Sequence, residues 1–324
     1  MIVVTGGAGF IGYNLVKKLI ETGHKEIVVI DNGWDNIQRF QIRAVKDILV
    51  GFDKVECMTV EDSFLWLGMN VSKIKHVIHL GARTDTTEKN EKIFNELNIR
   101  YSKFIWSFCA KNNIPLIYAS SAAVYGDGRL GFNDDTVEQY LTPLNPYGWS
   151  KLLFDDWVSV QDETPPHWAG LRFFNVYGPY EEHKDRMASV VWHFYNQIKE
   201  TDKVNLFKSH KEYCQHGEQK RDFIYVQDIV DAIFWFMSKT PFGIYNLGTG
   251  KARSYNDLAK AIFKSLGKEE NIQYIDMPED IRDSYQYFTE ANLRNLRSTG
   301  YNKVFTSLES GIDKYIKLLE NENC

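Results

Sequence analysis

Short apolar runs alternate with longer amphipathic segments along the first half of the chain. The runs IVVTG, EIVVID, HVIHLGA and PLIYASS are separated by segments with helical spacing, such as NLVKKLIETG and SKFIWSFCAKN. Alternation of strand and helix predicts parallel strands joined by crossover helices. Within the apolar runs there is little polar alternation, as expected when helices cover both faces of a sheet. The pattern therefore predicts an α/β fold with a doubly wound parallel sheet.

The pattern loosens beyond about residue 178. There the chain contains a charged loop, YEEHKDR, a helical segment over about residues 187–199, and a polar insertion, KSHKEYCQHGEQKRD. The later segments RDFIYVQDIVDAIFWFM and GIYNLGTG indicate a helix and a strand that rejoin the main body. We predict a dinucleotide-binding domain of residues 1–174, with residues 220–240 returning to it. Residues 175–324 would mainly form a smaller, interleaved C-terminal substrate domain.

Composition and charge narrow the classes of function. The 324 residues are 44% hydrophobic and carry a net charge of −5, so nothing indicates nucleic acid or an anionic membrane as a partner. The four cysteines show no metal-ligand spacing, so we expect reduced thiols, no metal site and a cytoplasmic protein. The apolar runs are shorter than the roughly 20 residues that span a bilayer, and we expect no signal segment.

The segment TGGAGFIG, residues 5–12, lies between the first predicted strand and the first predicted helix. Gly6 permits a tight turn, Gly9 lets backbone N–H groups approach a pyrophosphate, and Gly12 lets the helix pack on the strand. The helix N-terminus presents partial positive charge to the phosphates. Asp31 ends the second strand, where a ribose hydroxyl would lie. Together these features predict a Rossmann-type sheet that binds a dinucleotide.

The choice between NAD and NADP stays open at this point. Asp31 favours the unphosphorylated ribose because a carboxylate repels a 2′-phosphate, but Arg39 follows closely. If Asn32 and Arg39 hold a phosphate while Asp31 turns aside, NADP fits. We assign NADP, with NAD as the alternative. Leu80, Gly81 and Ala82 end another strand, and Asn98 lies on the following helix, where the cofactor would pass.

The segment NPYGWSK places Tyr147 and Lys151 one helical turn apart at the start of a predicted helix. Lowering a phenol pKa from about 10 to about 7 needs about 4 kcal/mol. An ammonium about 4 Å away supplies roughly that much at an effective dielectric of about 20, helped by the cationic oxidised nicotinamide. The strand PLIYAS ends at Ser120 and Ser121, where a hydroxyl can orient a substrate alcohol. Ser121, Tyr147 and Lys151 therefore predict a catalytic trio.

Several motifs carry a resemblance to a known family. TGGAGFIG, YASSAAVYG and YGWSK are similar to the extended branch of the short-chain dehydrogenase/reductase superfamily, which works on nucleotide-activated sugars. LRFFNVYGPYEEHKDRMASV, KRDFIYVQDIVDAIFWF and YQYFTEANLRNLRSTGYNK further resemble the ADP-glyceromanno-heptose 6-epimerases, which set the C6 configuration of the heptose of lipopolysaccharide cores. The resemblance is strongest over residues 118–189 and 220–250 and weakest over 33–73.

The resemblance implies a redox epimerisation. Bound NADP takes hydride from C6 of the heptose, the transient ketone presents its other face, and the same hydride returns. Protons must then be transferred from two directions, and the family uses Tyr147 and a lysine of the loop after YGP, here Lys184. Lys184 can serve if burial or neighbouring cations lower its pKa towards neutrality. The resemblance also implies a homo-oligomer.

Candidate substrate contacts follow from the same resemblance. Arg221 has the clearest physical basis because a guanidinium can donate two hydrogen bonds to the pyrophosphate of an ADP-sugar. The other substrate candidates are Ser121, Asn175, Arg186, His193, Phe207 and Tyr285. Further candidate cofactor contacts are Phe10, Ile11, Arg83, Lys151, Val176 and Lys184.

Departures from the family pattern leave other substrates open. Arg186 stands where relatives have a small serine, and residues 208–219 contain an insertion, so an altered heptose or another nucleotide would also fit. A hexose 4-epimerase shares the glycine turn and the trio, and Lys184 with its loop discriminates against it. A 4,6-dehydratase fits poorly because Ala122 and Ala123 follow Ser121 in place of acidic residues. A non-catalytic dinucleotide sensor is the remaining alternative, although such sensors usually lose the tyrosine or the lysine.

Overall fold

The computed structural model describes residues 1–47, 49, 51–239, 241–282 and 285–322. The chain forms two compact units. Unit 1 comprises Met1–Ser121, Pro146–Arg172 and Val230–Tyr245, and unit 2 comprises Ala122–Asn145, Phe173–Ile229 and Asn246–Cys324. Residues 122–145 thus belong to unit 2, whereas the sequence analysis placed them within 1–174. The segment that returns to unit 1 is 230–245, whereas the prediction was 220–240.

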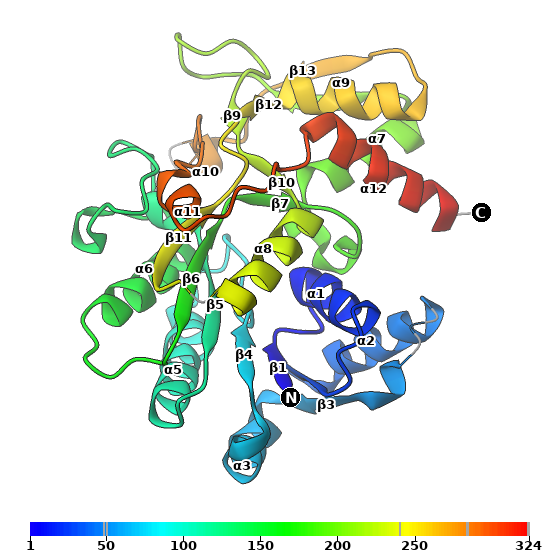
Figure 1. The fold of residues 1–324 in the computed structure, drawn as a ribbon. Coiled ribbons are helices and arrows are strands. Elements are labelled where there is room, and N and C mark those ends of the chain that lie inside the picture. Colours follow the sequence, from blue (N-terminus) through cyan, green and yellow to red (C-terminus); the bar gives the residue numbers. More distant parts are fainter. Residues whose placement is uncertain (48, 50, 240, 283–284, 323–324) are drawn as a thin grey trace. The chain divides into compact units, whose positions relative to one another are not determined.

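Unit 1 is built on a seven-stranded sheet with the strand order β11-β6-β5-β4-β1-β2-β3 (Figure 1). Successive strands extend outward on both sides of β1, so the sheet is doubly wound as predicted. β1 pairs in parallel with β2 and with β4, and the carboxyl ends of β1 and β4 flank the switch point where such sheets bind ligands. The strands are β1 (Ile2–Thr5), β2 (Ile27–Asp31), β3 (Val55–Thr59), β4 (His76–His79), β5 (Leu116–Ser121), β6 (Trp168–Phe173) and β11 (Gly243–Leu247).

Helices and short helical turns connect these strands. The helices are α1 (Phe10–Glu21), α2 (Trp34–Lys46), α3 (Val60–Asn70), α4 (Glu91–Phe94), the π-helical η3 (Asn95–Arg100), α5 (Tyr101–Lys111), α6 (Pro146–Ser159) and α8 (Val226–Lys239), with 3₁₀ turns η1 (Phe52–Lys54) and η2 (Val71–Lys73). Val3, Val28 and Trp106 are almost completely buried in one apolar cluster. Burial of each such side chain contributes about 1.5–3 kcal/mol, which explains why the strand runs are apolar throughout.

The described residues of unit 2 form three short strand pairs and an apolar core. The strands are β7 (Asn175–Tyr177) with β10 (Phe223–Tyr225), β8 (Val204–Phe207) with β13 (Ile272–Ile275), and β9 (Lys220–Arg221) with β12 (Arg253–Ser254). The helices are η4 (Ala122–Tyr125), η5 (Glu138–Tyr140), η6 (Glu182–Met187), α7 (Val190–Thr201), α9 (Tyr255–Leu266), α10 (Glu279–Arg282), α11 (Arg294–Ser298) and α12 (Leu308–Glu322). Ile198, Ile262 and Ile312 from α7, α9 and α12 are fully buried in the core.

The described residues contain neither a membrane-spanning helix nor a cluster of metal ligands. None of the helices they form has the length and apolar character needed to cross a membrane. In the same residues, no group of three or more His, Cys, Asp or Glu side chains could hold a metal ion.

Candidate active site

The glycine turn of unit 1 lies against the backbone that follows β4. Gly6 has a φ of 68°, and a Cβ there would lie 2.6 Å from the backbone nitrogen of Gly81. A Cβ on Gly12 would lie 2.1 Å from the carbonyl oxygen of Gly6, so α1 packs directly on the turn. Among the described atoms, a Cβ on Gly9 would approach only that same carbonyl oxygen, at 3.2 Å. Packing therefore requires Gly6 and Gly12, whereas Gly9 leaves its backbone accessible to a ligand.

The N-terminus of α1 suits an anion. Gly9 is the N-cap and makes no side-chain cap hydrogen bond, and the first turn contains no acidic residue. The first N–H groups of a helix have no partner within the helix, and they carry partial positive charge. Phe10 is buried, whereas Ile11 is partly exposed. The turn and the helix start thus fit the pyrophosphate of a dinucleotide.

Asp31, at the end of β2, bonds to the glycine turn. Its carboxylate accepts hydrogen bonds from the Ala8 N–H at 3.0 Å and the Asn32 N–H at 2.8 Å. It also accepts one from the Asn36 amide at 3.1 Å. Burial raises the pKa of Asp31, while these hydrogen bonds and Arg39 lower it. Arg39 donates to the Asn36 side-chain oxygen at 3.0 Å. The side-chain amide of Asn36 therefore bonds both Asp31 and Arg39, the two candidates for ribose recognition.

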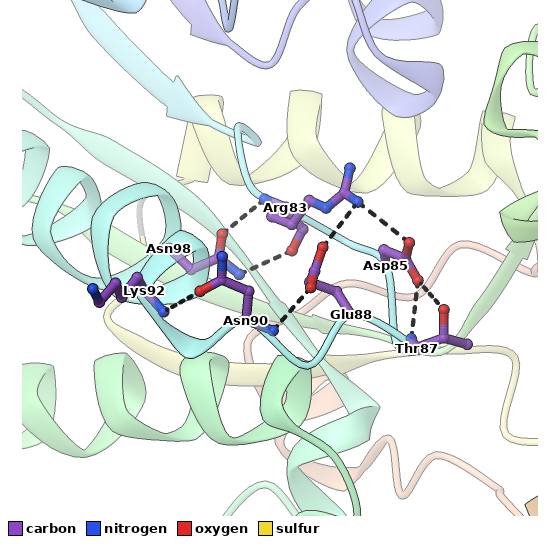
Figure 2. A network of polar contacts seen from close by, with 7 residues as sticks. All are labelled: Arg83, Asp85, Thr87, Glu88, Asn90, Lys92 and Asn98. Atoms are coloured by element: carbon purple, nitrogen blue, oxygen red, sulfur yellow. Dashed lines mark hydrogen bonds and ion pairs between the residues drawn. The ribbon is translucent and has the colours of Figure 1, made fainter. Parts of the chain in front are cut away.

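Asn98 of η3 fixes the backbone that follows β4 (Figure 2). Its amide oxygen accepts from the Arg83 N–H at 2.7 Å, and its amide nitrogen donates to the Arg83 carbonyl oxygen at 2.9 Å. The same nitrogen donates to Ser150 Oγ at 2.9 Å. The exposed Arg83 guanidinium lies 3.3 Å from Asp85 and 3.5 Å from Glu88. Asn98 thus holds the loop through its backbone, and a direct contact of Asn98 or Arg83 with the cofactor stays a prediction.

Ser121, Tyr147 and Lys151 come together within unit 1. Lys151 is buried, and its ammonium donates to the Ala119 carbonyl oxygen of β5 at 2.9 Å. Tyr147 makes a side-chain hydrogen bond with Ser121 at the end of the same strand. Pro146 is the first residue of α6, where its missing N–H leaves no helical hydrogen bond unmade. The end of β5 and the first two turns of α6 therefore hold the three side chains that the sequence pattern predicted.

Burial changes the proton affinity of both groups on α6. It raises the pKa of Tyr147 above 10, and the hydrogen bond with Ser121 partly offsets this. It lowers the pKa of Lys151 to about 8, while Asp155 acts in the opposite direction. The protein alone therefore does not bring the phenol pKa near 7, because loss of solvation penalises the phenolate more than the hydrogen bond stabilises it. Activation of Tyr147 needs further positive charge beside the phenol.

Sequence reasoning missed a buried ion pair close to the trio. Arg172 Nε of β6 lies 2.9 Å from Asp155 Oδ2, and both side chains are 0% exposed. The same carboxylate accepts hydrogen bonds from Ser120 Oγ at 2.7 Å and from the Tyr118 hydroxyl at 3.2 Å. Two features of the sequence could have indicated it. Asp155 follows Lys151 by one helical turn in LLFDDWV, and Arg172 interrupts the apolar strand AGLRFF.

Lys184 lies in a loop of unit 2 whose two ends are hydrogen-bonded to the buried carboxylate of Glu181. Glu181 accepts from the N–H and the hydroxyl of Ser189, each at 2.6 Å, and from the Gly178 N–H at 3.3 Å. Asp185 in this loop has a φ of 45°, a conformation that non-glycine residues rarely adopt. Burial lowers the pKa of Lys184, and Glu181 opposes the change. The direction of this shift is the one that a general acid and base requires.

Three of the predicted substrate residues lie together in unit 2. The rings of Phe207 and Tyr285 are 6.3 Å apart, and the Arg221 guanidinium lies 5.2 Å from the Tyr285 ring. Arg221 is buried, and it donates to the backbone carbonyl oxygens of Lys220 and Gln286. A guanidinium stacked on aromatic rings and held by carbonyl oxygens is a rigid donor group suited to a planar or anionic ligand.

The remaining candidates are distributed over other elements of unit 2. Asn175 and Val176 lie on β7, paired with β10, and Asn175 is exposed. On α7, His193 Nε2 lies 3.3 Å from the carbonyl oxygen of Arg186, whose side chain is exposed. Contacts of these residues with substrate or cofactor stay predictions.

The fold and the site together define a class of protein. A doubly wound parallel sheet with a glycine turn at its switch point, and with Ser, Tyr and Lys at the end of β5, is the arrangement of a dinucleotide-dependent enzyme that acts on an alcohol or ketone. The sequence matches the NAD dependent epimerase/dehydratase family over residues 2–248, and the chain belongs to this family. A nicotinamide dinucleotide is therefore its cofactor class.

Individual relatives are similar over nearly the whole chain. The ADP-L-glycero-D-manno-heptose-6-epimerase of Fusobacterium nucleatum is 46% identical over 98% of this chain and 97% of its own length. The enzyme of the same name from Nitratidesulfovibrio vulgaris (strain Hildenborough) is 42% identical with the same coverage. Among solved structures, the Helicobacter pylori ADP-L-glycero-D-manno-heptose-6-epimerase has a TM-score of 0.78 and 29% identity, covering 98% of this chain and 96% of that one.

Proposed function

We propose that the protein inverts C6 of an ADP-linked manno-heptose by transient oxidation to the 6-ketone. The observation that carries the proposal is the Ser121–Tyr147 hydrogen bond next to the buried Lys151, at the carboxyl end of β5. Full-length relatives with 42–46% identity that are named for this reaction support the choice of substrate. The site geometry thus supports the oxidation of an alcohol, and the relatives support an ADP-linked heptose as the substrate.

A bound nicotinamide dinucleotide would be held at the glycine turn of Gly6, Gly9 and Gly12, and it would supply the hydride acceptor and donor that the oxidation and reduction of C6 require. During oxidation the C6–H and O–H bonds break while C=O forms. Ser121 orients the hydroxyl, and the Tyr147 phenolate takes its proton. Lys151 contributes positive charge that stabilises the phenolate, and an oxidised nicotinamide ring would add the further positive charge that the protein alone does not provide.

The return step needs a proton for the new alkoxide on the other face. We assign this proton to the ammonium of Lys184 in unit 2, whose lowered pKa makes it a better acid. Tyr147 then releases its proton to solvent and Lys184 regains one, so protons balance over a full cycle. C6 therefore regains a hydride and its oxygen regains a proton, so the sugar undergoes no net oxidation.

We propose NADP as the cofactor, with NAD as the alternative. Asn32 is exposed at the end of β2, and Arg39 is partly exposed beside the Asn36 amide that also binds Asp31. These groups could receive a 2′-phosphate, whereas Asp31 has its oxygens turned to the N–H groups of Ala8 and Asn32. Calorimetric titration of the protein with NADP⁺ and with NAD⁺ decides between them, because NADP⁺ should bind more tightly and Arg39→Ala should remove the difference.

A substrate panel tests the proposed function. The purified protein is incubated with ADP-D-glycero-D-manno-heptose, UDP-glucose and UDP-galactose, and the products are resolved by NMR. Inversion at C6 of the heptose alone supports the proposal. Inversion at C4 of a hexose would favour the related 4-epimerase reaction, and dinucleotide binding without any turnover would favour a sensor.

We also propose a cytoplasmic homo-oligomer. The proposal is based on the reduced-thiol cysteine pattern and on the resemblance to extended short-chain enzymes. Light scattering of the purified protein tests the assembly, because an oligomer should give a mass that is two or more times the 37.7 kDa of one chain.

A further inference from the structure

We propose that Asp155 is a positioning residue of the catalytic site, which keeps the Lys151 ammonium charged and fixes the strand end that carries Ser121, with Arg172 balancing its charge. The inference deepens the proposed function and rests on it, because Asp155 is assigned to act through Lys151 and Ser121. Its evidence lies entirely within unit 1.

The first part of the evidence is the placement of Asp155 on α6. Asp155 follows Lys151 by one helical turn, so both side chains lie on the same face of α6. Asp155 is 0% exposed and Lys151 is 6% exposed, so little solvent screens the attraction between them. A buried ammonium loses its hydration and tends to lose its proton, unless a nearby carboxylate favours the charged form.

The second part is the contact of Asp155 with β5. Its carboxylate accepts from the Tyr118 hydroxyl at 3.2 Å and from Ser120 Oγ at 2.7 Å. Between these residues, the Ala119 carbonyl oxygen accepts from the Lys151 ammonium at 2.9 Å. Three consecutive residues before Ser121 are therefore bonded to one turn of α6. The hydroxyl of Ser121 is positioned by this anchored strand end.

The third part is the charge balance of the cluster. Arg172 Nε on β6 lies 2.9 Å from Asp155 Oδ2, so the buried carboxylate has a buried cation as its partner. His79, at the end of β4, also faces Lys151, but burial and that ammonium lower the pKa of His79 to about 3. It is therefore neutral at physiological pH. Asp155 is the charged group that raises the pKa of Lys151, among the groups that the described residues of unit 1 contribute to this cluster.

The proton affinity of Lys151 agrees with this geometry. Burial lowers its pKa to about 8, and Asp155 opposes the decrease. Without the carboxylate the pKa of Lys151 falls further, so Lys151 loses its proton at a lower pH. A neutral amine no longer stabilises the Tyr147 phenolate, and the alkaline limit of activity moves to lower pH.

The test is Asp155→Asn, with Asp156→Asn as the matched control. The asparagine keeps the size of the side chain and an acceptor oxygen for Ser120, but it removes the charge. Asp156 is the next residue of α6 and is partly exposed. The titration midpoint of Lys151 is followed by NMR of proteins with ¹³C-labelled lysine side chains, assigned with Lys151→Arg, in the ligand-free protein. The pH dependence of kcat is measured in parallel.

The expected result is a decrease of the Lys151 midpoint by about one pH unit or more in Asp155→Asn, which is a tenfold loss of proton affinity. The alkaline limb of kcat should move in the same direction, and Asp156→Asn should move neither. An unchanged Lys151 midpoint in Asp155→Asn overturns the proposal. If wild type shows no turnover, the proposed function fails, but the NMR midpoint still decides the role of Asp155.

Asp155→Asn leaves the Arg172 cation buried without an anionic partner, and this variant could fail to fold. A second variant keeps the proposal testable in that case. The double variant Asp155→Asn/Arg172→Gln removes both charges of the pair. It should show the same decrease of the Lys151 midpoint, because Arg172 does not provide the negative charge that holds the lysine proton. Retention of the wild-type midpoint in the double variant also overturns the proposal.

Discussion

The amide nitrogen of Asn98 donates to Ser150 Oγ at 2.9 Å, and Ser150 Oγ in turn donates to the Tyr147 carbonyl oxygen at 2.7 Å. Asn98 is 1% exposed, and its amide also bonds both backbone groups of Arg83. One buried amide thus connects the loop after β4 to the first turn of α6. The candidate cofactor loop and the candidate base therefore share an anchor.

Replacement of this anchor should weaken cofactor binding and turnover together. Asn98→Leu leaves the N–H and carbonyl of Arg83 without their partner, which costs about 1–3 kcal/mol for each buried group. We expect a cofactor Kd at least about tenfold higher and a lower kcat. Fluorescence titration and steady-state kinetics measure both. Asn90→Ala is the control, since Asn90 is an exposed cap of α4, and its loss should leave the Kd unchanged. Normal cofactor affinity in Asn98→Leu would contradict the anchor.

The glycine turn gives a second prediction. In Gly12→Ala the new Cβ would lie 2.1 Å from the Gly6 carbonyl oxygen, so α1 and the turn must separate. We expect the dissociation constant of the dinucleotide, measured by calorimetry, to rise at least about tenfold. Gly68→Ala on α3 is the matched control, because no described atom lies within 4 Å of a Cβ there. If Gly12→Ala binds the dinucleotide like wild type, the turn is not the phosphate site.

Acid stability should depend on His79. Its ring lies between Thr5 Oγ1 at 2.6 Å and Ser102 Oγ at 2.8 Å, and burial lowers its pKa from 6.5 to about 3. The unfolded chain therefore binds the proton first. The contribution of neutral His79 is complete above about pH 6.5 and falls by up to about 1.4 kcal/mol per pH unit between about pH 6.5 and 3.

Urea unfolding followed at several pH values checks this prediction. The difference in midpoint between wild type and His79→Gln should shrink as the pH falls below about 6.5, because the variant lacks the group that titrates. A constant difference over this range would show that His79 titrates alike in the folded and unfolded states.

Lys184 should be required for turnover but not for folding. Lys184→Met keeps a side chain of similar length and removes the proton donor, so we expect kcat to fall by about 10²–10⁴. Lys199→Met on α7 is the control, since Lys199 is exposed and pairs with Glu320 at the surface. Thermal unfolding should be nearly unchanged in both variants. Wild-type turnover in Lys184→Met would remove Lys184 from the mechanism.

The parts of the site that the sequence predicted are those with short-range spacing. Gly6, Gly9 and Gly12 lie within one turn and one helix start, and Tyr147 and Lys151 lie one helical turn apart. Such spacings determine geometry as soon as the local element is known. The doubly wound sheet was also predicted correctly, because the alternation of strands and helices along the chain restricts the possible topologies.

The parts that were missed depend on long-range packing. Asp155 and Arg172 are 17 residues apart on different elements, and an aspartate in a helix is usually solvated. Residues 122–145 lack a periodic pattern, so their membership of unit 2 could not be read from spacing. The proximity of Phe207, Arg221 and Tyr285 depends on β8, β9 and a residue outside the helices and strands of unit 2, and their selection came from the family resemblance.

The most direct test of the proposed reaction follows the hydrogen at C6. Wild-type protein converts ADP-D-glycero-D-manno-heptose in D₂O, and the product is examined by NMR at C6, with Tyr147→Phe as the inactive reference. Transfer and return of hydride predicts an inverted C6 that carries no deuterium. Deuterium at C6 of the inverted product would mean that the hydrogen left as a proton, and it would contradict oxidation of the C6 alcohol by the Ser121, Tyr147 and Lys151 site.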